Sequence, residues 1–207
     1  DGFFMHNADD QISSCLDKNF IAFFPNIFDL SIERLKIYNF KNHKNNLFSA
    51  VSHGVGTGTL RKKNTLNESN NKRVKTLEYL KKNCLMDINF DFYVINNIQP
   101  VWASEFENKI SDSYMGLCLQ REPFLKYGIS DRFAQYQGNG LMTLIPSQLH
   151  LQDLFVPNKE AIFFSCDSEL KELVNYYSSN KEKALNIAKS GWERGHSDYN
   201  ERVITKY

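Results

Sequence analysis

The stretch 130–146 changes its hydrophobic period in the middle, from helical spacing to a continuous apolar run. Ser130 or Asp131 can cap a short helix, because a side-chain oxygen accepts backbone N–H groups of the first turn, and the glycines that follow can end it. Leu141 to Ile145 then predicts a buried strand, since strands of a parallel sheet are covered on both faces. The stretch is one α/β unit, and it limits the chain to folds built from such units.

The start of that helix is a candidate phosphate site. Free N–H groups and the positive end of the helix dipole meet there. Three basic residues, Arg121, Lys126 and Arg132, lie within a few positions of this end in the sequence. We therefore expect a phosphorylated ligand in front of the helix.

Apolar runs alternate with helical patterns through most of the remaining chain. The predicted strands are 47–51, 88–95, 114–119 and 161–164, and the predicted helices are 73–84, 101–110, 169–177 and 181–192. The polar segment 64–71 is predicted to be a surface loop. Because right-handed crossovers leave few other topologies, the alternation predicts an α/β fold with a doubly wound parallel sheet, Rossmann-like.

The first 44 residues indicate the remnant of a second α/β domain followed by a linker, in which Tyr38 and Phe40 are packing anchors. A boundary near Lys44 separates this remnant, 1–44, from the Rossmann-like domain, 45–207. Because the chain opens on what resembles the end of an α/β unit, we expect a piece of a longer protein.

Charge and cysteine usage exclude several classes of function. The formal net charge of +1 argues against bulk binding to nucleic acid or a membrane surface. No apolar stretch approaches the ~18 residues of a spanning helix. The four cysteines lack paired metal spacing and Asp-x-Asp is absent, so we expect reduced thiols, no metal site and a cytoplasmic location.

A glycine-rich loop follows the first of these strands. Its notable residues are His53, Gly54, Gly56, Arg61 and Lys62. Open α/β sheets bind phosphate at the carboxyl ends of their strands, where glycine lets the backbone approach the ligand. The dinucleotide fingerprint G-x-G-x-x-G is not met, so a phosphate-binding loop and a flexible turn both stay open.

Several segments, taken in order, show a family resemblance. They are the hinge Phe24-Pro25-Asn26, the glycine-rich basic loop, the helix and turn Arg132 to Gly140, the phrase Asp153-Leu154-Phe155, and Glu160 to Phe164 before a helix capped at Asp167 or Ser168. This order resembles the nucleotide-sugar half of GT-B glycosyltransferases. The closest likeness is to the CgeB-like and group 1 enzymes of bacterial surface-polysaccharide pathways, and it covers 45–207.

The resemblance implies two facing Rossmann-like domains, with 1–44 as the end of the acceptor domain and 45–207 lining most of the donor cleft. It implies an enzyme that moves a hexosyl or related group from a nucleotide-diphosphate sugar to a glycan, lipid-linked or protein acceptor, with no permanently bound cofactor. A general base would come from the acceptor domain. Group 1 members place a ribose-binding glutamate at the position of Gln135, so an amide would make that contact here.

The candidate site residues follow from the charge on the leaving group, because fixed cations stabilise a departing diphosphate. The catalytic candidates are His53, Arg61 and Lys126. The donor-binding candidates are Gly54, Gly56, Lys62, Asn97, Arg121, Glu122, Tyr127, Ser130, Asp131, Arg132 and Gln135. Alternatives stay open: residues 61–63 as a solvated loop, Arg132 as a structural ion-pair partner, and the whole chain as an inactive nucleotide-binding module or a structural partner domain.

Overall fold

The computed structural model describes residues 27–51, 63–93, 101, 103–120, 122 and 124–206, with the backbone alone for 63–71. In chain order, the helices and strands of these residues are η2 Ile37–Asn39, β1 Leu47–Ala50, α3 Lys63–Asn83, β2 Phe90–Tyr93, α4 Ala103–Ile110, β3 Met115–Leu117, α5 Arg132–Gly138, β4 Met142–Pro146, η3 Ser147–Leu149, η4 Leu151–Asp153, β5 Ile162–Phe164, α6 Asp167–Ser179, α7 Lys181–Asp198 and α8 Glu201–Ile204. Within these residues, no helix is long and apolar enough to cross a bilayer.

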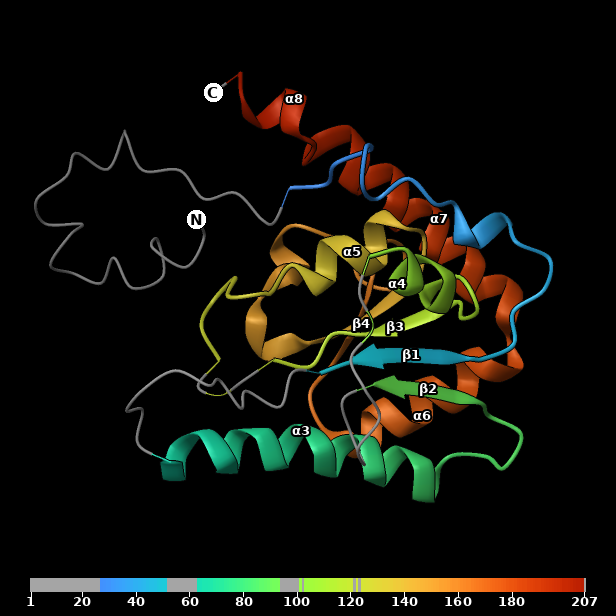
Figure 1. Ribbon diagram of the computed structural model, residues 1–207, viewed down its shortest axis with the longest axis vertical. Coiled ribbons are helices and arrows are strands. Elements are labelled where there is room, and N and C mark those ends of the chain that lie inside the picture. Colours follow the sequence, from blue (N-terminus) through green and yellow to red (C-terminus); the bar gives the residue numbers. More distant parts are fainter. Residues whose placement is uncertain are drawn as a thin grey trace, which may run out of the picture.

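Five parallel strands form one sheet in the order β2-β1-β3-β4-β5 (Figure 1). Leu47 of β1 lies between Phe90 of β2 and Met115 of β3, and Leu144 of β4 pairs with Ile162 of β5. Because every strand runs the same way, all carboxyl ends meet at one edge of the sheet. The predicted doubly wound parallel sheet is confirmed.

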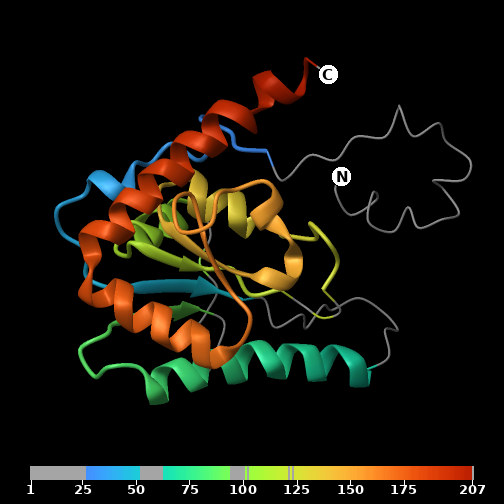
Figure 2. The same ribbon diagram turned by 180° about the vertical axis from the view of Figure 1, so that it is seen from behind.

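Helices cover both faces of the sheet. α3 and α6 lie side by side on one face in both views, and α4 and α5 lie on the other (Figures 1 and 2). Leu77 of α3 and Leu170 of α6 belong to the core under the first face, and Phe133 and Tyr136 of α5 belong to the core under the second. α7 packs against β4, α5 and α6. Each sheet face is buried, as the apolar strands predicted.

α3 is longer than the pattern predicted. It begins at Lys63, so the polar segment 64–71 is helical and the prediction of a surface loop there is wrong. Apolar periodicity marks only the part of a helix that packs on a core, and in α3 the buried Leu77 and Leu80 lie in the second half. The first half has no such pattern to detect.

The ends of α5 and α6 differ in part from the capping predictions. α5 ends at Gly138, and Gly140 takes a positive φ of 89°, as expected for a glycine after a helix. At the N-cap of α5, Asp131 makes no side-chain cap hydrogen bond, and α6 begins at Asp167 with Cys166 as an uncapped N-cap residue. In α6 the Glu169 carboxylate instead accepts a hydrogen bond from the backbone N–H of Ser165 at 2.7 Å.

The segment before β1 packs on the sheet domain. The Phe28 N–H donates to the Tyr199 carbonyl at 3.0 Å, and its side chain is fully buried. Of the two predicted anchors, Tyr38 packs edge-on against Trp192 at 5.9 Å, whereas Phe40 is exposed. The boundary near residue 44 stays a prediction, and the elements predicted before residue 27 lie outside the described residues.

Candidate functional site

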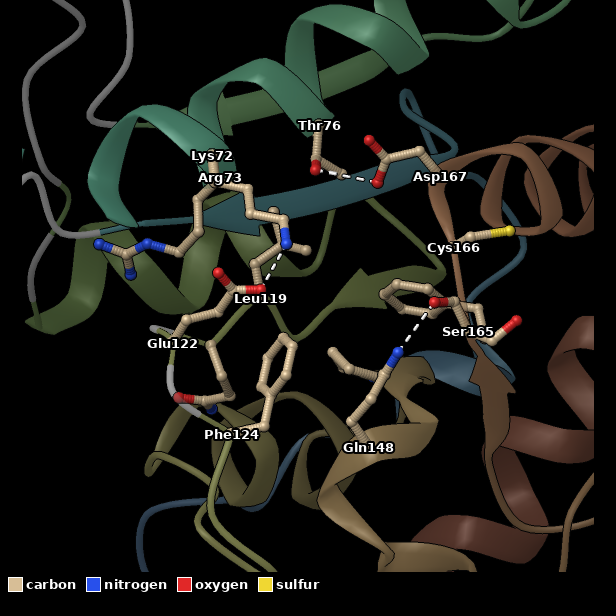
Figure 3. A pocket seen from close by; sticks show the side chains of 13 residues that line it. Lys72, Arg73, Thr76, Leu119, Glu122, Phe124, Gln148, Ser165, Cys166 and Asp167 are labelled. Atoms are coloured by element: carbon tan, nitrogen blue, oxygen red, sulfur yellow. Dashed lines mark hydrogen bonds and ion pairs between the residues drawn. The ribbon is translucent and has the colours of Figure 1, made fainter. Parts of the chain in front are cut away.

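A cavity of about 320 Å³ lies at the carboxyl edge of the sheet (Figure 3). It is bounded by the ends of β4 and β5, the loop after β3, the first turn of α6, and one side of α3. Ligands of open parallel sheets bind at this edge, because the loops and helix N-termini that follow the strands converge there. The cavity is the candidate site.

α3 contributes three polar side chains to the cavity, Lys72, Arg73 and Thr76. Residues three and four apart share a helix face, so Thr76 lies on the same side of α3 as Lys72 and Arg73. The Thr76 hydroxyl donates a hydrogen bond of 3.0 Å to Asp167 Oδ1. This bond fastens α3 to the start of α6 and holds two walls of the cavity together (Figure 3).

The start of α6 forms the wall next to α3, with Ser165, Cys166 and Asp167 lining the cavity. The first turn of a helix presents backbone N–H groups and partial positive charge, which favour an anionic ligand. The pKa of Cys166 is lowered by hydrogen bonds, first from the Ser168 hydroxyl and then from the Glu169 backbone.

Aromatic and amide side chains complete the cavity. Phe124, on the loop after β3, and Phe164, at the end of β5, supply apolar surface. Gln148 follows β4, and its amide donates a hydrogen bond of 2.8 Å to the Ser165 carbonyl. The lining therefore offers ring surface for a flat group beside polar groups for a charged or hydroxylated one.

Lys72 and Glu122 meet across the cavity in an ion pair, which joins α3 to the loop after β3 (Figure 3). Both side chains are partly solvated, with exposed fractions of 64% and 41%. Glu122 was predicted from the sequence as a donor contact. Its observed partner is on a helix 50 positions away in the chain.

The predicted phosphate-facing start of α5 lies beside this loop. The Gln120 amide, which lines the cavity, donates to Ser130 Oγ at 3.0 Å, and the Arg132 guanidinium donates to the Leu119 carbonyl at 3.2 Å. Ser130 and Arg132 thus fix the positions of Gln120 and Leu119, which line the cavity. Gln135 is half-buried in the next turn of α5.

Lys126 lies in a second polar cluster, outside the cavity lining. Its ammonium pairs with Asp153 at 3.5 Å, and the Tyr127 hydroxyl donates to the same carboxylate at 2.8 Å. The pKa of Lys126 is raised, by Tyr127 first and by Asp153 after it, so the side chain stays charged at neutral pH. Tyr127 and His150 both take a positive φ, near 59° and 56°, and the Tyr127 N–H donates to Leu149 at 2.8 Å. Ala103 and Asn158, outside this cluster, also take a positive φ, so the backbone conformation alone does not mark the cluster as a site.

Metal ligation has no candidate cluster in the part of the chain that the structure describes. There, no three His, Cys, Asp or Glu side chains lie close enough together to hold a metal ion.

Comparison with protein families decides the identity of the chain. The model of the family described as glycosyl transferase-like matches residues 61–205, which is more than half of the chain. The chain belongs to the glycosyl transferase-like family. This match confirms the family resemblance found in the sequence, while the CgeB-like subtype stays a prediction. No curated protein matches the chain.

Solved structures share the fold at low sequence identity. The C-terminal domain of the glycosyl transferase group 1 family protein LpcC from Francisella tularensis has a TM-score of 0.48 and 9% identity, over 77% of this chain and 88% of that one. Anabaena Alr3699/HepE, solved in complex with UDP and glucose, has a TM-score of 0.54 and 10% identity, over 78% and 46%. Sucrose-phosphate synthase (tll1590) from Thermosynechococcus elongatus has a TM-score of 0.51 and 12% identity, over 87% and 47%. This chain spans about half the length of the last two proteins.

The structure places the predicted site residues of this glycosyl transferase-like chain in three groups. Glu122 lines the cavity, whereas Tyr127 and Lys126 share the Asp153 cluster and Ser130 to Gln135 belong to the start of α5 and the residues before it. His53, Gly54, Gly56, Arg61, Lys62, Asn97 and Arg121 lie outside the described residues.

Sequence reasoning missed the α3 and α6 walls of the cavity. The signal for α6 was present, because Ser165 to Asp167 follow the carboxyl end of a predicted strand and open a helix, the same rule that selected the glycine-rich loop. For α3 the predicted helix 73–84 included Arg73 and Thr76, but nothing in the local sequence shows that the side of this helix lies at the carboxyl edge of the sheet.

Proposed function

We propose that this chain is the donor-binding half of a glycosyltransferase and takes a nucleotide-diphosphate sugar at the carboxyl edge of its sheet. The observation that supports the proposal most directly is the cavity there, lined by Lys72, Arg73 and the first turn of α6. Its volume lies within the range of small-molecule pockets. Together with membership of the glycosyl transferase-like family, this site favours a phosphorylated sugar donor.

Transfer of the sugar leaves negative charge on the departing diphosphate, and positive charge nearby stabilises it. Lys72 and Arg73 on α3 and the dipole of α6 supply it without a metal. His53, Arg61 and Lys62 of the glycine-rich loop are proposed to act with them, because that loop follows β1 at the same edge of the sheet. Lys126 is proposed to approach the donor from the second cluster, where Asp153 and Tyr127 orient it.

The sugar and the nucleoside are proposed to lie between the two groups of residues. Anabaena HepE, which shares the fold, was solved with UDP and glucose, and a uridine nucleotide is therefore the first donor to test here. Gln135 would contact the ribose through its amide. The acceptor, a glycan, lipid-linked or protein group, would bind on a second domain, and 1–44 would be the end of that domain and the linker. Surface polysaccharide synthesis is the proposed setting.

The test is titration of the purified chain with UDP, GDP and ADP by calorimetry, paired with an assay for hydrolysis of the matching nucleotide sugars. Binding with donor hydrolysis supports the proposal. Binding without hydrolysis, when the second domain is also present, identifies an inactive nucleotide-binding module. No binding of any nucleotide overturns the proposal in favour of a structural partner domain.

Variants locate the site within the same titration. Arg61→Ala and Lys126→Ala are expected to weaken binding of the nucleoside diphosphate about tenfold each, because each removes a charge-assisted contact. Lys189→Ala is the matched control, because Lys189 lies on the exposed side of α7, where it pairs with Glu193 at 3.9 Å and does not line the cavity. Unchanged affinity in the first two variants refutes the assignment of these residues.

A further inference from the structure

Two kinds of contact connect the elements around the cavity: hydrogen bonds between its walls, and one ion pair between two long, partly exposed side chains. Thr76 donates to Asp167 at 3.0 Å and Gln148 donates to the Ser165 carbonyl at 2.8 Å, so α3, α6 and the residue after β4 are fixed to one another. Across the cavity, by contrast, the Lys72 ammonium meets the Glu122 carboxylate (Figure 3). The two kinds of contact differ in how easily a ligand can replace them.

The ion pair is the replaceable contact. With exposed fractions of 64% and 41%, its two side chains stay partly hydrated and the pair is weak. A change of partner costs Lys72 and Glu122 little free energy, because neither side chain is held in one conformation by burial. A phosphate group offers Lys72 more negative charge than one carboxylate does, and the first turn of α6, on the neighbouring wall, attracts it as well.

We propose that the ligand enters by partner exchange: its diphosphate takes Lys72 from Glu122, and the Glu122 carboxylate, no longer paired with Lys72, accepts hydrogen bonds from sugar hydroxyls. This inference rests on the proposed function, because it names which residues read the two parts of a nucleotide sugar. In the empty site Glu122 neutralises Lys72 and competes with the incoming anion. In the filled site the Lys72 ammonium faces the diphosphate and the Glu122 carboxylate faces the sugar hydroxyls. A carboxylate only accepts hydrogen bonds, and a hydroxyl can donate them.

The exchange predicts effects of opposite sign for the two residues. Lys72→Gln is expected to weaken UDP binding about tenfold, since it removes a charge-assisted contact to phosphate. Glu122→Gln is expected to tighten UDP binding about two- to fivefold, since it removes the competitor for Lys72. The same Glu122→Gln change is expected to lower the affinity for UDP-glucose relative to UDP, because the sugar loses its acceptor.

A double-mutant cycle with UDP tests the mechanism rather than the mere presence of charge. If Glu122 acts by competing for Lys72, the gain from Glu122→Gln disappears in the Lys72→Gln background. Lys189→Gln and Glu193→Gln remove the two members of a similar exposed Lys–Glu pair on α7, and they should leave UDP affinity unchanged. Thermal unfolding of each variant shows whether it is folded before titration.

The outcomes separate this inference from the function on which it rests. Partner exchange is supported if Lys72→Gln weakens UDP binding, Glu122→Gln tightens it, and Glu122→Gln no longer tightens it in the double variant. If wild type binds UDP but Glu122→Gln weakens binding or leaves it unchanged, or if the gain persists without Lys72, the exchange is refuted and the proposed function stands. If wild type binds no nucleoside diphosphate, the proposed function fails and the exchange fails with it.

Discussion

Phe28 offers a direct measure of how strongly the segment before β1 is bound to the sheet domain. Its ring is fully buried and packs edge-on against Phe133 at 5.7 Å. The absence of side chains at Gly138 and Gly195 makes the slot for it, because a Cβ added at Gly195 would lie 2.5 Å from the ring and one at Gly138 would lie 3.0 Å from it. Phe28→Ala leaves that slot empty, and we expect a loss of about 3–5 kcal/mol in the free energy of unfolding.

The assay is unfolding in urea and by heat, followed by circular dichroism. The expected loss corresponds to a fall of about 6–20 °C in Tm for a domain of this size. Leu30→Ala is the matched control, because Leu30 lies two residues away with 50% of its surface exposed, and we expect a change within about 0.5 kcal/mol. If Phe28→Ala lowers the free energy of unfolding by less than about 1 kcal/mol, the segment before β1 is not bound to the sheet domain as described.

Gly195→Ala provides an independent check on the same slot. In the wild-type background the new methyl group meets the Phe28 ring, so we expect destabilisation. In the Phe28→Ala background the obstacle is gone, and alanine in a helix is favoured over glycine by up to about 1 kcal/mol, so the same change should stabilise. An equal effect in both backgrounds would show that the ring does not occupy the slot.

Two further predictions concern ionisable groups. Burial raises the pKa of Glu33 above its ordinary value of 4.5, so the folded state holds that proton more tightly, and the stability this contributes is present below 4.5 and lost as pH rises through the raised folded value. Glu33→Gln should therefore be more stable than wild type at pH 7 but not at pH 4, in thermal unfolding at both values; equal differences at the two pH values would contradict this. Cys166, whose pKa is lowered, should react with iodoacetamide faster than Cys84 and Cys118, whose pKa values burial raises to about 11 and about 12. Peptide mass spectrometry checks the order, UDP should slow Cys166 alone, and equal rates at the three thiols would refute the prediction.

Hydrophobic period accounts for most of the fold that could be predicted. The α/β unit at 130–146 appears as α5 and β4, and the other predicted strands appear at the expected places, although 94 and 95 of the predicted strand 88–95 lie outside the described residues. Strand burial follows from the same pattern, because a parallel strand that is covered on both faces is a nearly continuous apolar run. The first half of α3 could not be predicted this way, since its sequence is polar and carries no apolar period.

Helix capping could be predicted only in part from residue type and position in the sequence. Asp131 and Asp167 are residues that often cap helices, and both stand where a helix begins. The structure uses Asp167 to accept from Thr76 on α3 instead, a partner 91 positions earlier in the chain. A side chain with two possible partners goes to the one that the packed helices bring within reach, and sequence spacing contains no record of that choice.

The sequence by itself determined the class of fold and the family, and it predicted the edge of the sheet where we expect the site, because strand and helix periods and the order of segments are local properties of the chain. Only the tertiary structure decided which side chains meet at that edge. Lys72 and Glu122 face each other there because the crossover that follows β1 lays α3 beside the loop that follows β3. Phe28 enters the core for the same kind of reason, since only packed helices bring two glycines together around one ring.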